Sequence, residues 1–345
     1  MRRAGVGVIG CGFMGAHVHL PALKSIPGAE IVAVSSRDAK KGKKIMKKFK
    51  AKFYYTKYLD LIEDPSVDAV FVCLPTFLHA QTVVDAAKAG KHVFCESPLA
   101  LTLEDTDRMV NAAKKAGVLL MPGQVLRFTP NYVKAKELID QDLIGKPILV
   151  SYRELIPAAV LARQWSPESW VWQKEKSRGL LFTVSVFALD LLRWLLNTEI
   201  ERVYSTEKIV LLKEFGNIQG FNAAIVLNFA GGAMGLMEYS SLVVPEMETN
   251  RLEVIGEKMG SLSATGNDAL ALYGVDPNMQ RWTFREGGTK AWGHHQEDEH
   301  FIECILQDRE PVVTAEDARK AQEIALAVMR SNEEGRPLLI ARAHR

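Results

Sequence analysis

Three glycines near the amino terminus have the spacing of a loop that binds phosphate groups. They follow an apolar segment, residues 6–9, in the pattern Gly-x-Gly-x-x-Gly, and residues 16–25 behind them have the pattern of a helix. The first glycine permits a tight turn, the second lets the backbone approach a pyrophosphate, and the third lets helix and strand pack closely. The helix amino terminus adds N–H groups and a positive dipole end. The residues predicted to contact a dinucleotide here are Gly10, Gly12, Phe13, Met14 and Gly15.

A second apolar segment, residues 30–35, ends in residues that favour one type of dinucleotide. An NAD site usually has an acidic residue about 20 positions beyond the glycines, where it binds the ribose 2′-hydroxyl. This chain has Ser36 and Arg37 there. A serine can donate a hydrogen bond to a 2′-phosphate and an arginine can grip it, so the pair favours NADP(H) over NAD(H). Asp38 is the opposing observation, since it can be the acidic residue in a slightly displaced position.

A polar bend at Glu96-Ser97-Pro98 marks a second place where chemistry is expected. It follows residues 92–95, which have the pattern of a short buried strand. Ligands of open parallel sheets bind outside the carboxyl ends of the strands. We therefore expect this bend to face both cofactor and substrate.

The elements that must position these residues change in type along the chain. Alternating strand and helix patterns up to about residue 123 predict a Rossmann domain, that is, a doubly wound parallel sheet. Strand patterns from residue 201 to about 285 predict a large and mostly antiparallel sheet. The helices predicted beyond residue 123 are 131–140, 180–196, 300–307 and 315–332. The fold class is therefore α/β, with domains at residues 1–123 and 124–345.

The composition excludes several classes of partner. A formal net charge of +2 on 345 residues gives no basis for a nucleic-acid or membrane role. No apolar stretch reaches the roughly 18 uncharged residues that a membrane span requires. The four cysteines are scattered without a Cys-x-x-Cys pair, which indicates a reducing compartment and no disulfide framework. We expect a cytoplasmic protein with a small-molecule substrate.

Motifs spread over nearly the whole chain match those of one family. They are Gly10-x-Gly12-x-x-Gly15, Pro75-Thr76 with His79, Gly90-Lys91-His92-Val93, Glu96-Ser97-Pro98, Arg127-Phe128-x-Pro130, Asp190-Leu-Leu-Arg-Trp and Val313-Thr314-Ala-Glu316-Asp317. On these motifs the sequence resembles the glucose-fructose oxidoreductase / inositol dehydrogenase / MocA (Gfo/Idh/MocA) family. The resemblance implies a Rossmann domain followed by an α/β domain whose open sheet commonly forms subunit interfaces, hence a dimer or tetramer. It also implies hydride exchange between a nicotinamide ring and a sugar, cyclitol or related hydroxyl-bearing carbon.

The resemblance further implies which residues lie on the cofactor side. Besides the glycine loop, they are Leu74, Pro75, Thr76, His79, Glu96 and Arg127. Arg127 resembles the arginine near the nicotinamide and the substrate, which makes it a catalytic candidate. Its structural alternative is a salt bridge between the domains.

The residues that usually transfer the proton in this family are replaced in this chain. Ser97 occupies the place of the lysine in Glu-Lys-Pro, and Thr183 and Phe187 occupy those of an aspartate and a histidine. A serine hydroxyl is a poor general acid, and a phenylalanine cannot transfer a proton. The predicted substrate pocket consists of Ser97, Trp172, Thr183 and Phe187. The candidates for a substitute acid are Tyr152, Lys174, Lys176 and Arg178, for which a plain surface or strand position is the alternative.

Other histidines suggest a metal only by composition. His17 and His19 lie in the helix after the glycine loop, where we expect them on the helix surface or in packing. Histidines and carboxylates gather at residues 294–300, but without a fixed ligand spacing. We interpret that segment as the polar start of a helix and predict no metal site.

Two hypotheses of function remain open. In the first, the protein is an NADP(H)-dependent oxidoreductase of this family that acts on a substrate other than the usual unmodified sugar or cyclitol. In the second, it is a catalytically silent protein that kept the cofactor site for a sensing or scaffold role. The glycine loop and Glu96 fit both hypotheses, whereas Ser97, Thr183 and Phe187 favour the second.

Overall fold

The chain forms two compact units in a computed structural model that describes residues 2–244, 250–274 and 280–340. The first unit contains the residues up to Val125 together with Gly293–Arg319, and the second contains Leu126–Trp292 together with the residues from Lys320 onwards. The chain first passes from the first unit to the second between Val125 and Leu126, two residues beyond the predicted boundary at residue 123. The prediction placed residues 293–319 in the second domain, whereas in the structure this segment packs with the first unit.

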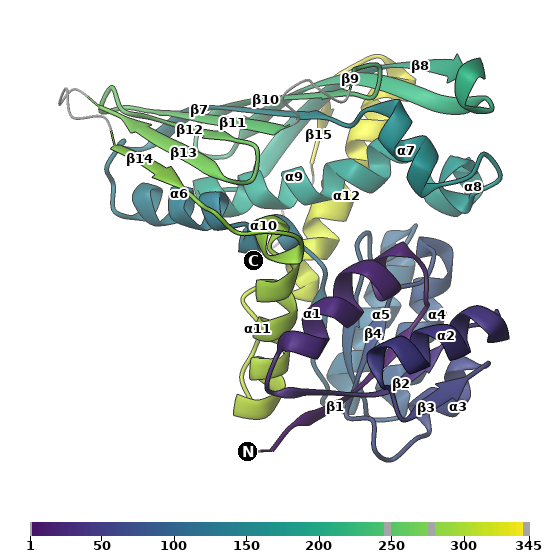
Figure 1. The fold of residues 1–345 in the computed structure, drawn as a ribbon. Helices are drawn as coiled ribbons and strands as arrows, with labels where there is room; N and C mark the ends of the chain where they lie inside the picture. The colour runs from purple at the N-terminus through teal and green to yellow at the C-terminus, as the bar shows by residue number, and fades with distance from the viewer. Residues whose placement is uncertain (1, 245–249, 275–279, 341–345) are drawn as a thin grey trace. The chain divides into compact units, whose positions relative to one another are not determined.

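The first unit is built on a six-stranded parallel sheet (Figure 1). Its strands are β1 (Ala4–Ile9), β2 (Ala29–Ser35), β3 (Phe53–Tyr55), β4 (Ala69–Val72), β5 (His92–Cys95) and β6 (Leu120–Pro122). The strand order is β3-β2-β1-β4-β5-β6, and every neighbouring pair is parallel. Every residue of β1 and β4 is buried, as expected for strands covered on both faces. The predicted Rossmann fold is confirmed.

Helices pack with these strands, and α2 and α5 begin at residues whose side chains cap them. The helices are η1 (Met14–His19), a π-helix, α1 (Leu20–Ser25), α2 (Ala39–Phe49), α3 (Tyr58–Ile62), η2 (Thr76–Leu78), α4 (His79–Lys88), α5 (Leu103–Ala116) and α11 (His294–Gln307). The Thr102 hydroxyl accepts the Asp105 N–H at the start of α5, and Gly117 ends the helix with φ 66°.

Helix α11 joins the first unit through its apolar side. Phe301 is fully buried, and its ring lies 5.6 Å from the Phe71 ring and 5.9 Å from the Phe94 ring. Phe71 and Phe94 are stacked on neighbouring strands at 4.7 Å. Aromatic pairs at such distances stabilise a core beyond the area that they bury. This packing is the physical reason why residues 293–319 belong with the parallel sheet.

The second unit is built on a nine-stranded sheet. Its strands are β7 (Pro147–Leu155), β8 (Ile200–Leu212), β9 (Ile218–Phe229), β10 (Met234–Ser240), β11 (Asn250–Gly256), β12 (Ser261–Thr265), β13 (Ala269–Tyr273), β14 (Gln280–Thr283) and β15 (Leu338–Leu339). The order is β14-β13-β12-β11-β7-β10-β9-β8-β15, in which only the β7–β10 pair of the described strands is parallel. The predicted large, mostly antiparallel sheet is confirmed.

Helices cover one face of this sheet (Figure 1). The helices outside the first unit are η3 (Val125–Phe128), which straddles the boundary, α6 (Pro130–Asp140), α7 (Ala158–Gln164), η4 (Trp170–Trp172), α8 (Lys174–Ser177), α9 (Leu180–Leu196), η5 (Lys213–Phe215) and α10 (Thr289–Trp292). The long helix α12 (Ala315–Glu334) starts in the first unit and ends in the second. The segment Lys174–Leu196 is long and apolar enough to span a membrane by composition. In this fold, however, 72% of its apolar 18-residue window is buried, as in a core helix.

Candidate active site

The glycine loop has the backbone that a dinucleotide site requires. Gly10 has φ +104°, and a Cβ at this position would collide with the carbonyl oxygen of Cys73. A Cβ at Gly15 would likewise collide with the Gly10 carbonyl. A Cβ at Gly12, in contrast, would meet no protein atom within 4 Å. Packing of the protein therefore requires Gly10 and Gly15, whereas Gly12 leaves open space into which a pyrophosphate fits. Of the two residues that follow Gly12, Phe13 is exposed and Met14 is half-buried.

The carboxyl end of β4 contributes the next part of the same sheet edge. Thr76 is buried there, and Leu74 and Pro75 are half-buried. His79 is also buried, with Nδ1 3.1 Å from the Pro98 carbonyl oxygen and Nε2 2.7 Å from the Leu74 carbonyl oxygen. Burial lowers the pKa of His79, so the ring is neutral and donates through one nitrogen at a time. His79 thus lies between the backbone after β4 and the backbone after β5 and can donate to either one.

The end of β2 presents Ser36 and Arg37 where a ribose is expected. The Ser36 N–H donates to the Tyr55 carbonyl, and the Ser36 carbonyl accepts the Tyr54 hydroxyl, which fixes the backbone. Arg37 is exposed. Asp38 accepts the Lys41 N–H at 3.0 Å as the N-cap of α2, so one of its carboxylate oxygens is used by the helix.

The bend after β5 carries a carboxylate that points into the protein. Glu96 is 9% exposed, and its Oε1 lies 2.7 Å from Nε2 of His19. A Cβ at Gly123 would lie 3.2 Å from Glu96 Oε2, so the glycine leaves room for this side chain. Ser97 follows, and its buried Oγ has no hydrogen-bond partner among the described residues. The Ser97 hydroxyl is thus a buried polar group at the carboxyl edge whose hydrogen-bonding capacity is unused by the described residues.

His19 is the residue of this region that sequence reasoning missed. It is fully buried, and its Nδ1 lies 2.9 Å from Oδ1 of Asp298 on α11. Burial alone lowers the pKa of an imidazole, but the charges and hydrogen bonds of Asp298 and Glu96 together raise the pKa of His19 well above its usual value. No spacing rule connects these positions, because 279 residues separate His19 from Asp298. The acidic composition of 294–300 was the only signal.

Helix α11 begins at His294, so the predicted polar helix start at 294–300 is confirmed, and the helix range predicted as 300–307 begins six residues too late. The described residues contain no group of three or more His, Cys, Asp or Glu side chains that could hold a metal ion. The side chains of Glu297 and Asp298 instead point into the core of the first unit.

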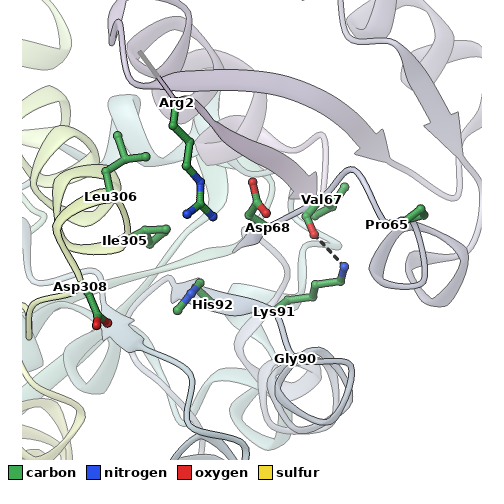
Figure 2. Close-up of a pocket in the computed structure, with 10 residues that line it drawn as sticks. All are labelled: Arg2, Pro65, Val67, Asp68, Gly90, Lys91, His92, Ile305, Leu306 and Asp308. Carbon is green, nitrogen blue, oxygen red and sulfur yellow. Dashed lines mark hydrogen bonds between the residues drawn. The ribbon is translucent and has the colours of Figure 1, made fainter.

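A surface cavity of about 450 Å³ lies at the other end of the parallel sheet (Figure 2). Its lining residues include Arg2 and Asp68 before β1 and β4, His92 at the start of β5, and Asp308 after α11. Lys91 in its wall donates to the Asp64 and Val67 carbonyls. This cavity is at the amino ends of the strands and is separate from the predicted cofactor edge.

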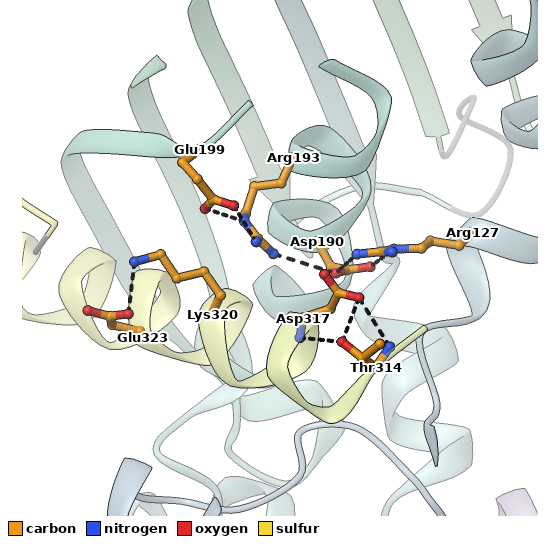
Figure 3. Close-up of polar contacts among 8 residues, drawn as sticks. All are labelled: Arg127, Asp190, Arg193, Glu199, Thr314, Asp317, Lys320 and Glu323. Atoms are coloured by element: carbon orange, nitrogen blue, oxygen red, sulfur yellow. Dashed lines mark hydrogen bonds and ion pairs between the residues drawn. The ribbon is translucent and has the colours of Figure 1, made fainter. Parts of the chain in front are cut away.

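In the second unit, Arg127 forms a bidentate ion pair with Asp190 (Figure 3). Both hydrogen bonds are 2.6 Å long, and both side chains are buried. Arg193 lies 3.8 Å from Asp190 and pairs with Glu199 at 2.7 Å. Arg127 therefore braces η3 against α9 within this unit, whereas the structural alternative expected a salt bridge between domains.

The remaining predicted pocket residues lie on or before α9. Thr183 and Phe187 are half-buried and one turn apart, so they share a helix face. The Thr183 hydroxyl donates to the Gly179 carbonyl. Trp172 donates from Nε1 to the Ser166 carbonyl and packs edge-on against Trp165, at 6.4 Å between ring centroids. Lys174 is exposed and paired with Glu333, which matches its plain surface interpretation.

A carboxylic acid among tyrosines lies on β7 in the second unit. The fully buried Tyr152 donates its hydroxyl to Glu154 Oε2 at 3.2 Å. Burial raises the pKa of Glu154 to about 7. Glu154 is opposite Tyr239 on β10, and the hydroxyls of Tyr239 and Tyr132 have no hydrogen-bond partner among the described residues. Sequence reasoning named Tyr152 as a substitute acid but missed Glu154, two residues further along the same strand face.

Comparison with known proteins gives the family. Residues 4–124 match the Gfo/Idh/MocA profile described as an oxidoreductase family with an NAD-binding Rossmann fold. Residues 136–340 match the profile of the C-terminal α/β domain of the same oxidoreductases. The chain belongs to the Gfo/Idh/MocA family. The resemblance on which the site residues were predicted is thereby confirmed.

Several members of the Gfo/Idh/MocA family are similar along the full length. The myo-inositol 2-dehydrogenase of Thermotoga maritima is 32% identical over 337 residues, covering 96% of this chain and 97% of the relative. The scyllo-inositol 2-dehydrogenase (NAD(+)) of Bacillus subtilis is 28% identical over 346 residues, covering 96% and 94%. The crystal structure of a probable dehydrogenase from Thermotoga maritima is 30% identical with a TM-score of 0.83, covering 97% of this chain and 98% of that one.

Proposed function

We propose that the protein is an NADP(H)-dependent oxidoreductase acting on a sugar, cyclitol or related small molecule. It would interconvert a hydroxyl-bearing carbon and a carbonyl. The observation that carries this proposal is the glycine loop, in which Gly10 and Gly15 are required by packing while Gly12 borders open space. Membership of an NAD-binding oxidoreductase family and the similarity to inositol dehydrogenases support the class of reaction.

The bound nicotinamide supplies or accepts the hydride in such a reaction. The chain must hold the cofactor and move the proton of the substrate hydroxyl. Backbone N–H groups of the glycine loop bind the pyrophosphate. For the proton we propose the Glu154 carboxyl, because a group with a pKa of about 7 is populated in both protonation states near neutral pH. Tyr152 orients this carboxyl through its hydroxyl.

The second candidate function is a catalytically silent protein that binds the cofactor for sensing or as a scaffold. The replacement of the usual proton-transfer residues by Ser97, Thr183 and Phe187 favours it. Glu154 favours the enzyme, because its carboxyl can transfer a proton near neutral pH although it is not at any of the positions that usually do so in this family.

A substrate screen separates the two functions. Polyols and their carbonyl counterparts are tested by the absorbance of the reduced nicotinamide with the unmodified protein and with Glu154→Gln. We expect turnover by the unmodified protein and a loss of about 10²- to 10⁴-fold in Glu154→Gln, the usual contribution of one acid-base group. Glu238→Gln, on the exposed side of the neighbouring strand β10, is the matched control. Turnover that occurs only after Ser97→Lys would support the silent protein instead.

We propose a preference for NADP(H) from the residues after β2. Ser36 and the exposed Arg37 can bind a 2′-phosphate, and Asp38 is used as the cap of α2. Fluorescence titration should show tighter binding of NADPH than of NADH. Arg37→Ala should weaken NADPH by about tenfold, the value of one charge-assisted hydrogen bond, and leave NADH unchanged. Equal binding of both nucleotides by the unmodified protein would refute the preference.

We also propose that two copies of the chain pair through the outer face of the nine-stranded sheet. Tyr204, Val226 and Leu236 are opposite one another on β8, β9 and β10, and each is at least 39% exposed. Together with Met234 and Ile255, which flank Leu149 on the neighbouring strands, these residues form what we call the outer apolar patch. Contiguous exposed apolar patches of this kind mark protein interaction surfaces. A self-complementary face of this kind suits a two-fold dimer.

A cytoplasmic location is part of the same proposal. Its support is that the scattered cysteines are free and buried and that the net charge is nearly balanced.

A further inference from the structure

We infer that His19 is a positioning residue of the proposed cofactor site. In this role the charged imidazole holds the Glu96–Ser97–Pro98 bend and the helix of the glycine loop in one geometry. The inference rests on the proposed function, since it assigns a residue to that cofactor site.

The geometry of His19 fits a cation. Both ring nitrogens face carboxylate oxygens, Glu96 Oε1 at 2.7 Å and Asp298 Oδ1 at 2.9 Å. A neutral imidazole has one N–H and can satisfy only one of them, whereas an imidazolium donates to both. These partners come from the bend after β5 and from α11, while His19 ends the π-helix that follows the glycine loop. One side chain therefore ties together three segments that are distant in sequence.

The surroundings of His19 allow no substitute charge. Its ring lies 5.4 Å from the Phe71 ring and 5.1 Å from the Phe94 ring, and its exposure is 0%. In such an apolar enclosure an unpaired carboxylate is costly. Loss of the imidazolium would remove the counter-charge of the buried Glu96 carboxylate and the partner of Asp298, whose pKa burial raises.

Three other titratable groups near this cluster have pKa values shifted towards the neutral form. Glu297 is 1% exposed, and burial with the charges of Glu96 and Asp298 raises its pKa well above the usual value. His294 lies 6.0 Å from the His19 ring, and burial lowers its pKa to about 4. His79 faces Glu96 from the side of α4 and has a lowered pKa through burial. The positive charge beside Glu96 thus comes from His19.

The held carboxylate is next to the residues of the proposed site. The Glu96 N–H donates to the Val72 carbonyl at the end of β4, and Ser97 follows directly with its unpartnered Oγ. On the other side of Ser97, the Pro98 carbonyl lies against the His79 ring. The bend is therefore fixed at both ends by histidines. Removal of His19 would release the end that carries the carboxylate.

The test compares nucleotide binding in His19→Gln with binding in two matched variants. NADPH and NADH are titrated by fluorescence at a temperature at which thermal melting shows each variant to be fully folded. We expect the dissociation constant to rise by about tenfold or more in His19→Gln. Glu297→Gln should bind as the unmodified protein does, because it replaces a neutral acid by a neutral amide of the same shape. Met109→Ala creates a cavity at a fully buried position on α5, so it should lower the melting temperature without changing nucleotide binding.

A double variant separates positioning from general destabilisation. His19→Gln with Glu96→Gln removes the uncompensated charge, so binding should recover part of the loss. This variant also serves if His19→Gln alone does not fold. The inference would be overturned if folded His19→Gln bound the nucleotides as tightly as the unmodified protein does. If only the double variant folds, binding equal to that of the unmodified protein would have the same meaning. Either result would leave the proposed function standing. An unmodified protein that binds neither nucleotide would overturn the proposed function together with the inference.

Discussion

Glu154 gives the second unit a residue whose chemistry depends on pH. Its carboxyl lies on the helix-covered face of β7, receives the Tyr152 hydroxyl, and has a pKa raised to about 7 by burial. Perturbed pKa values of this kind gather at functional sites. In the first unit, the Ser97 hydroxyl is buried but has no neighbouring partner to activate it. The proton chemistry of this chain is therefore expected at Glu154 and not at Ser97.

The raised pKa of Glu154 should be measurable as a pH dependence of stability. The folded state binds the proton more tightly than the unfolded state, whose carboxyl has the model value of 4.5. Stability contributed by the protonated acid is present below this value and is lost as pH rises towards 7. The loss is up to about 3 kcal/mol, reduced by solvent screening because the side chain is only half-buried.

Denaturant unfolding from pH 4.5 to 8 checks this expectation as the difference between the unmodified protein and Glu154→Gln. The difference should change in favour of the variant as pH rises. A difference that stays constant over this range would show that the carboxyl titrates normally.

At the scale of elements, the glycine loop separates the needs of the fold from those of a ligand. Gly12→Ala should leave the melting temperature nearly unchanged, because the new Cβ meets no protein atom, but weaken nucleotide binding by about tenfold or more. Gly15→Ala should lower both, since its Cβ collides with the Gly10 carbonyl. Thermal melting and fluorescence titration on the same samples decide the matter. Normal binding by Gly12→Ala would place the phosphates elsewhere.

The Arg127–Asp190 pair should act mainly on stability. It is buried and bidentate, so removing one partner leaves an uncompensated charge. Asp190→Asn should lower the free energy of unfolding by about 3–5 kcal/mol. Glu199→Gln, at the exposed end of the same chain of ion pairs, should cost less than about 1 kcal/mol. Normal stability of Asp190→Asn with lost activity would return Arg127 to a catalytic role.

The sequence predicted elements with regular apolar patterns most accurately. Residues 92–95 and 180–196 were predicted as the strand and helix that the structure shows as β5 and α9. The interpretation of 294–300 as the polar start of a helix is confirmed, although the helix range itself was predicted only from residue 300. The burial of Glu297 and Asp298 goes against the usual preference and was not predicted. The π-helix η1 was predicted as an ordinary helix, since its sequence carries no feature specific to the wider turn.

The candidate site was predictable only where it is local in sequence. The glycine loop, Ser36 and Arg37 and the bend at Ser97 each depend on a few consecutive residues. His19 was missed because partners far along the chain define it, and Glu154 was missed because its burial defines it. A single sequence reveals neither. Arg127 was found, but its partner Asp190 is 63 residues away, so its engagement in an ion pair needed the structure.

At the scale of the whole molecule, the outer apolar patch predicts self-association. Leu236→Lys, at the centre of the patch on β10, should convert an oligomer into smaller species in light scattering coupled to size exclusion. Ile209→Lys is the matched control. Ile209 is 50% exposed, but it and its cross-strand partner Phe221 point to the face of the sheet that does not carry the outer apolar patch. The same mass for the unmodified protein and Leu236→Lys would show that the patch is not the interface.

The membership of α11 in the first unit limits how the protein can be divided. A gene fragment that ends at residue 123 would encode all six parallel strands and the glycine loop, but not Phe301 or Asp298. It would expose the stacked rings of Phe71 and Phe94 to water and leave the imidazolium of His19 with a single counter-ion. A nucleotide-binding fragment of this protein must therefore be made by fusing residues 293–319 back to the parallel sheet, since cutting the chain once removes part of its core.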